Sequence, residues 1–165
     1  MSMSRLFPIL FATGLALATP ASADPMLDFF KGRSTATASF KAINGVNRNF
    51  TVKLNGRAYG RSLTLVEDFA FEDGVRSRKT WRFTKMGENR YTGTREDVIG
   101  TTNVRLNGNI AKFTYLVDLD EGPGENIVRF FDTIKIAADG KSALNTAIVT
   151  KYGLPVAKVR VDFRK

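Results

Sequence analysis

Short runs of alternating apolar and polar residues fill the chain from residue 24 onward. In the last run, apolar residues from Ala157 to Phe163 alternate with charged residues from Lys158 to Arg164. A period of two is typical of a strand with one buried face, and Gly, Asn and Asp between the runs are typical of turns. The pattern therefore predicts strands at residues 34–42, 49–59, 62–71, 75–85, 90–96, 98–106, 110–119, 127–137, 142–151 and 156–164.

So many sequential strands would leave two unpaired edges in an open sheet, and closure into an up-and-down barrel removes both. We therefore predict an all-β fold, a single antiparallel up-and-down barrel of about 8–10 strands spanning residues 24–165. A short helix is predicted over Met26–Lys31, ending at Gly32. Its Phe29 and Phe30 side chains are expected to plug one end of the barrel.

Residues 1–23 have the features of a secretory signal peptide. Arg5 precedes an apolar run over residues 6–17, and Ala21–Ala23 forms a small-x-small cleavage site. The apolar run is too short to cross a bilayer as a helix. We expect cleavage before Asp24 and a periplasmic protein that is not a lipoprotein, because the chain has no Cys.

The composition excludes several kinds of site. The chain contains no His and no Cys, the usual ligands of zinc and haem and the usual bases and nucleophiles of acyl transfer. We therefore predict no metal, no cofactor and no disulfide.

The charge is strongly basic, with 25 Lys+Arg against 16 Asp+Glu and a formal net charge of +9. Arg76, Arg78, Arg82 and Lys85 form a stripe on an outward face. This stripe is either a solvated face or a site of transient contact with an anionic membrane surface. Nucleic acid is not expected as a partner, because the aromatic residues alternate inward and leave no stacking platform. We expect a monomer.

Two charged residues share faces with apolar residues. Glu67 lies between Leu65 and Phe69 in the third run, and Lys79 precedes Trp81 on the inward face of the fourth. A three-residue loop between these strands sets Glu67 opposite Lys79, whereas a two-residue loop would turn arginines inward at a high cost in buried charge. The predicted Glu67–Lys79 ion pair either fixes the strand register, or orients the polar head of a ligand or moves a proton.

Further polar residues extend this set. Asp132 lies on the apolar face of the eighth run, either as a core carboxylate that meets Tyr115 or Asn145 or as a ligand contact. Lys151 ends the ninth run, either as a solvated strand end or as a cap at the barrel mouth. The alternation does not determine which way Asp97 faces. The candidate ligand-binding residues are Glu67, Lys79, Trp81, Tyr115, Asp132 and Lys151.

Several segments together resemble a known family. They are Leu27–Gly32, Leu65–Gly74, the lone Trp81, Tyr91–Thr94 running to Asp97–Gly100, and the ending from Lys151 to Lys165. This combination is similar to a proteobacterial envelope family catalogued as a domain of unknown function, number 3833 in its series. The resemblance implies a lipocalin-like barrel and a neighbourhood with genes for fatty-acyl modification, and it implies no catalytic residue. The chain differs from the members of that family that carry a lipidated Cys.

Three functions fit these observations. The first is a periplasmic binding protein for a fatty acid, lipid or other small apolar ligand, tied to envelope lipid modification. The second is an isomerase or hydratase that acts on a lipid, with Glu67 or Asp132 as general base and Tyr115 or Lys79 as proton donor. The third is a barrel with a solid core that serves as a structural or interaction module.

Overall fold

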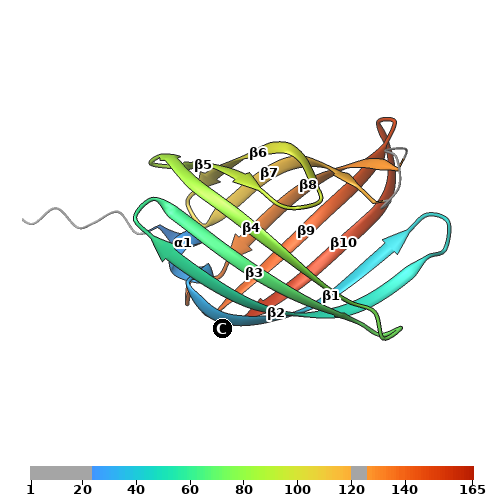
Figure 1. The fold of residues 1–165 in the computed structure, drawn as a ribbon, viewed down its shortest axis with the longest axis horizontal. Coiled ribbons are helices and arrows are strands. Elements are labelled where there is room, and N and C mark those ends of the chain that lie inside the picture. Colours follow the sequence, from blue (N-terminus) through green and yellow to red (C-terminus); the bar gives the residue numbers. More distant parts are fainter. Residues whose placement is uncertain (1–23, 120–125) are drawn as a thin grey trace, which may run out of the picture.

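The described part of the chain is a closed barrel. The computed structural model describes residues 24–119 and 126–165, so the predicted signal peptide lies outside the described residues. Each strand pairs antiparallel with its neighbours in the sequence, and β1 pairs with β10 to close the sheet (Figure 1). The strands are β1 (Gly32–Ala42), β2 (Asn47–Tyr59), β3 (Ser62–Phe71), β4 (Arg76–Gly87), β5 (Arg90–Thr94), β6 (Val98–Asn107), β7 (Ile110–Asp118), β8 (Ile127–Ile136), β9 (Ser142–Lys151) and β10 (Leu154–Arg164).

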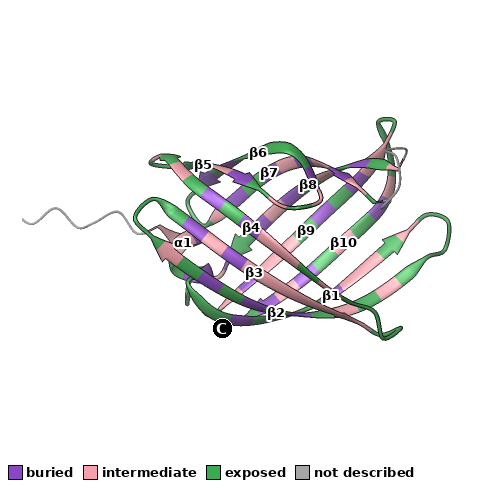
Figure 2. Ribbon diagram, viewed as in Figure 1, coloured by how far each residue is buried: buried purple, intermediate pink, exposed green. Residues whose placement is uncertain are grey.

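The predicted all-β barrel is confirmed, and the ends of the predicted strands differ from the observed ones by at most two residues. Burial alternates along the strands as the sequence pattern requires (Figure 2). In β10, for example, Ala157, Val161 and Phe163 are buried, whereas Lys158 and Arg164 are exposed. The inward residues of all ten strands form one hydrophobic core cluster.

The register of β3 against β4 is the predicted one. Leu65 lies opposite Trp81, and Glu67 lies opposite Lys79. The Phe71 N–H donates to the carbonyl oxygen of Val75 at 3.0 Å. The connecting loop therefore has three residues, and the arginines of β4 remain on the outer face.

Helix α1 (Pro25–Phe30) lies at one end of the barrel, one residue before its predicted position (Figure 1). Met26, Phe29 and Phe30 are each at most 3% exposed. A Cβ added at Gly56 of β2 would lie 1.7 Å from the carbonyl oxygen of Phe30, so only glycine allows the helix end to approach this closely. The predicted plug is confirmed.

Asp24 holds the start of α1 in place. Its Oδ1 accepts from the Leu27 N–H at 3.2 Å as an N-cap, and its Oδ2 accepts from the Tyr91 hydroxyl and from Lys85 Nζ. These contacts tie the helix to β4 and β5. Within residues 24–119 and 126–165, no helix has the length and apolarity needed to cross a bilayer.

Candidate functional site

The barrel encloses a cavity of about 490 Å³. Met26 and Phe30 of α1 line its closed end. Val46 and Leu119 line its other end and are 46% and 50% exposed, so the cavity reaches the surface opposite the helix. A cavity of this size can hold one small ligand. The interior is therefore not the solid core of the third hypothesis.

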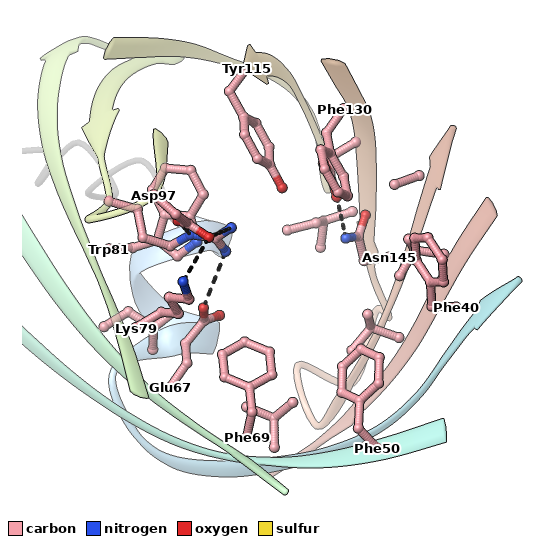
Figure 3. Close-up of a pocket in the computed structure, with 18 of the residues that line it drawn as sticks. Phe40, Phe50, Glu67, Phe69, Lys79, Trp81, Asp97, Tyr115, Phe130 and Asn145 are labelled. Carbon is pink, nitrogen blue, oxygen red and sulfur yellow. Dashed lines mark hydrogen bonds and ion pairs between the residues drawn. The ribbon is translucent and has the colours of Figure 1, made fainter. Parts of the chain in front are cut away.

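Aromatic rings form much of the cavity wall. The Tyr115 ring is edge-on to Trp81, with 5.2 Å between ring centroids, and is stacked on Phe130 at 5.3 Å. Figure 3 shows Phe50 and Phe69 on the opposite wall. Rings at these positions provide an apolar surface for a ligand with an alkyl chain or a flat ring system.

The turn between β5 and β6 places Arg95 inside the barrel. Its Nε donates to Asp97 Oδ1 at 2.6 Å, and its Nη2 donates to Asp97 Oδ2 at 3.2 Å. The guanidinium carbon lies 4.8 Å from the centre of the Trp81 ring, close enough for a cation–π interaction. The Arg95 side chain is only 13% exposed. Sequence reasoning did not select Arg95, and it left the facing of Asp97 open.

The predicted Glu67–Lys79 ion pair is wrong, although the register that places the two residues opposite each other is right. Lys79 Nζ lies 3.0 Å from Asp97 Oδ2, and Glu67 Oε2 lies 3.6 Å from Arg95 Nη1 (Figure 3). The turn after β5 reaches inward and brings Arg95 against the Glu67 side chain and Asp97 against the Lys79 side chain. Each predicted partner therefore contacts an opposite charge from this third segment.

Burial raises the pKa of Glu67 to about 7, against the attraction of Arg95 and with added repulsion from Asp97 and Asp132. Burial also acts to raise the pKa of Asp97, but the contacts with Arg95 and Lys79 outweigh it and hold this pKa below its usual value. The pKa values of Glu67 and Asp97 are therefore shifted in opposite directions. Asp97 is the permanent counter-ion of the cluster, and Glu67 titrates near neutral pH.

Asp132 of β8 lies on another part of the cavity wall and is 4% exposed. The Asn145 side-chain amide donates to Asp132 Oδ1, which confirms one of the two predicted partners. Burial raises the pKa of Asp132 to about 6, and Asn145, the Tyr115 hydroxyl and Arg95 partly oppose that rise. The Tyr115 hydroxyl points into the cavity (Figure 3). The cavity thus holds a second carboxyl group that titrates below neutral pH.

The sixth candidate residue, Lys151, does not line the cavity. Its Nζ lies 2.8 Å from Asn126 Oδ1 at the end of β9. Glu67, Lys79, Trp81, Tyr115 and Asp132 all line the cavity. Among the residues that the structure describes, no group of acidic side chains is arranged to hold a metal ion.

The outer basic stripe is partly neutralised by neighbours. Arg78 contacts Asp68 at 2.5 Å, and Arg82 lies 3.5 Å from Glu96. Lys85 turns toward Asp24 at the closed end of the barrel. The stripe therefore presents less uncompensated charge than the sequence alone indicates.

Comparison with known proteins identifies the family. The family model described as "Protein of unknown function (DUF3833)" matches residues 16–165. The chain belongs to this family. The predicted family is thereby confirmed. A search of curated proteins finds no sequence that matches this DUF3833 member.

Solved structures share the fold of this DUF3833 member at very low sequence identity. The S-type phycobiliprotein lyase CPES from Guillardia theta has a TM-score of 0.61 at 9% identity, covering 85% of this chain and 90% of the lyase. Rv2717c from M. tuberculosis has a TM-score of 0.59 at 11% identity, covering 85% of this chain and 94% of that protein. These likenesses establish the barrel architecture.

Proposed function

We propose that this protein is a periplasmic binding protein that holds one small apolar or amphipathic molecule, of the size of a fatty acid or small lipid, inside its barrel. The observation that carries the proposal is the cavity of about 490 Å³, closed by α1 and open at the other end. Its wall is mostly aromatic and apolar, with polar side chains gathered around Arg95 and Asp132. This division suits a ligand that has one apolar and one polar part.

The first test is native mass spectrometry of the protein isolated from the periplasm, followed by extraction and identification of bound molecules. We expect a chain that begins at Asp24 and carries about one apolar small molecule. Trp81 is the only tryptophan, is 4% exposed and lines the cavity, so its fluorescence reports ligand uptake in titrations.

A matched pair of variants tests whether the ligand occupies the barrel. Ala147 of β9 is 3% exposed and lines the cavity, whereas its neighbour Ile148 is 39% exposed on the outer face. We expect Ala147→Phe to fill part of the cavity and weaken binding at least tenfold, or about 1.4 kcal/mol. Ile148→Phe should leave the affinity unchanged. Equal affinities in both variants would place the ligand elsewhere.

We also propose that the open end contacts an anionic membrane surface, where ligand enters or leaves. Exposed apolar residues lie in or directly beside the turns at this end, including Ile43 (79% exposed), Tyr152 (91%) and Leu154 (69%), the first residue of β10. The β1–β2 and β9–β10 turns that carry them both lie opposite α1 (Figure 1). Apolar side chains on a chain of net charge +9 suit a surface of anionic lipid.

Co-sedimentation with lipid vesicles tests the membrane contact. We expect binding to phosphatidylglycerol vesicles, and weaker binding to phosphatidylcholine vesicles or in high salt. The double variant Ile43→Ser, Leu154→Ser should reduce vesicle binding by about tenfold. Ile148→Ser, on the side of the barrel, is the control and should have no effect. Equal losses in the two variants would contradict contact through the open end.

A further inference from the structure

We infer that the polar end of the ligand is a hydrogen-bond donor, a hydroxyl or ammonium group, held by Asp132 and Asn145, and that it is not a carboxylate or phosphate. This inference rests on the proposed ligand-binding function and specifies the chemical class of the ligand. It excludes a free fatty acid and favours a fatty alcohol, a fatty amine or another apolar molecule with a donor group.

The buried side-chain atoms of the cavity residues that lack a hydrogen-bond partner are all acceptors. The Tyr115 hydroxyl, a donor that also points into the cavity, interacts with Asp132. Among the described residues, Glu67 Oε2, Asp132 Oδ2 and Asn145 Oδ1 are buried without a hydrogen-bond partner. All three residues line the cavity. A buried acceptor without a donor is costly, so a ligand that brings donors gains more from this site than a ligand that brings further acceptors.

The Asn145 amide adds to this preference. One hydrogen of its Nδ2 donates to Asp132 Oδ1, and the amide oxygen has no hydrogen-bond partner within the protein. The aspartate and the asparagine together therefore present one free oxygen each. An ammonium group has enough hydrogen atoms to donate to both, and a hydroxyl can donate to one of them.

The cations inside the barrel are already engaged. Arg95 forms a bidentate contact with Asp97, and Lys79 contacts the same carboxylate. Glu67 lies against the remaining edge of the Arg95 guanidinium at 3.6 Å. A ligand carboxylate would have to compete with these protein carboxylates for both cations.

The charge of the inward-facing groups also favours a ligand with a donor group over an anionic ligand. Arg48 also lines the cavity, but it is paired with Asp73 outside the cavity. Of the other charged residues that line it, Arg95 and Lys79 supply two positive charges, whereas Glu67, Asp97 and Asp132 can supply three negative charges. With all five groups ionised, the cluster carries one excess negative charge. A neutral or cationic donor suits this balance, and an anion increases the repulsion.

A series of ligands with the same chain and different head groups tests the inference. Decylamine, decanol, decanoic acid and methyl decanoate are titrated into the protein at about pH 8, with Trp81 fluorescence as the readout. We expect the amine and the alcohol to bind about tenfold tighter than decanoic acid. Methyl decanoate, which has an apolar chain and no donor, should bind with intermediate affinity.

Asp132→Asn tests the location of the head group. We expect this variant to lose about tenfold in affinity for decylamine and to keep its affinity for methyl decanoate, which reports an intact cavity. Glu88→Gln removes an exposed carboxylate in the β4–β5 turn and should change neither affinity.

The outcomes separate the inference from the proposed function. Binding of decanoic acid as tight as that of decylamine and decanol would overturn the inference and leave the binding function standing. An unchanged preference for decylamine in Asp132→Asn would also overturn it. Failure of all four compounds to bind would instead contradict the proposed function.

Discussion

Replacing Arg95 with methionine is expected to destabilise the protein by about 3–5 kcal/mol at about pH 8. The variant keeps an apolar side chain against Trp81 but removes the cation that contacts Asp97 and Glu67, whose side chains are 16% and 12% exposed. A buried carboxylate that loses its cation keeps its desolvation cost without compensation. Urea unfolding monitored by Trp81 fluorescence measures the change.

Two further variants show whether charge is the cause. Glu67 contacts Arg95, whereas Asp97 also contacts Lys79 and keeps a cation when Arg95 is replaced. Arg95→Met combined with Glu67→Gln removes the carboxylate that has lost its cation, so this double variant should be more stable than Arg95→Met alone. Arg82→Met removes an arginine whose contact with Glu96 is exposed, and it should change stability by less than about 1 kcal/mol. An Arg95→Met protein as stable as Arg82→Met would contradict a buried ion cluster.

The sequence determined which strand residues face the cavity. Alternation with a period of two is strict within a strand, so Glu67, Trp81 and Asp132 could be assigned inward from their apolar neighbours. The choice of loop length then set Glu67 opposite Lys79, as the structure has it. These assignments depend only on local geometry, which one sequence contains.

The partners of the inward charges could not be obtained in the same way. Arg95 and Asp97 lie in the turn between β5 and β6, where no alternation defines a face. Their signal in the sequence is three consecutive charged residues, Arg95 to Asp97, between two glycines inside or beside strands, Gly93 and Gly100. That signal fits an exposed turn equally well.

The structure explains both of these glycines. A Cβ at Gly93 would lie 2.6 Å from the Phe83 ring, so the glycine lets β5 pack closely over the core. Gly100 has a φ of +73° in the part of β6 where the pairing with β7 shifts. A bulge is therefore present at Gly100, whereas Gly93 allows a close packing contact.

The stability of the fold is expected to change with pH. We expect the protein to be about 3 kcal/mol less stable at about pH 8 than at about pH 5, the reverse of what acid denaturation of paired carboxylates produces. Burial raises the pKa of Glu67 to about 7 and that of Asp132 to about 6, from ordinary values of 4.5 and 3.8. In this window the folded protein binds protons that the unfolded chain has released, so stability falls as the pH rises.

Other groups act outside this window. Contacts with Arg95 and Lys79 lower the pKa of Asp97, and contacts with Lys85 and Tyr91 lower the pKa of Asp24. The stabilisation that these two carboxylates provide is therefore lost only in stronger acid. Tyr115, which faces Asp132, has its pKa raised well above its usual value by burial and stays protonated throughout. Between about pH 5 and pH 8, Glu67 and Asp132 therefore dominate the pH dependence of the free energy of unfolding.

Glu67→Gln separates this effect from the general charge of the chain. Because the variant carries no carboxylate to desolvate, it should be about 2 kcal/mol more stable than the wild type at about pH 8 and nearly equal to it at about pH 5. Unfolding curves at both pH values measure this, with Glu88→Gln as the exposed control. A Glu67→Gln protein that is less stable than the wild type at about pH 8 would mean that the ionised carboxylate stabilises the fold through Arg95. A more stable variant would mean that an ionised Glu67 costs the fold stability, as expected of a group retained for ligand binding.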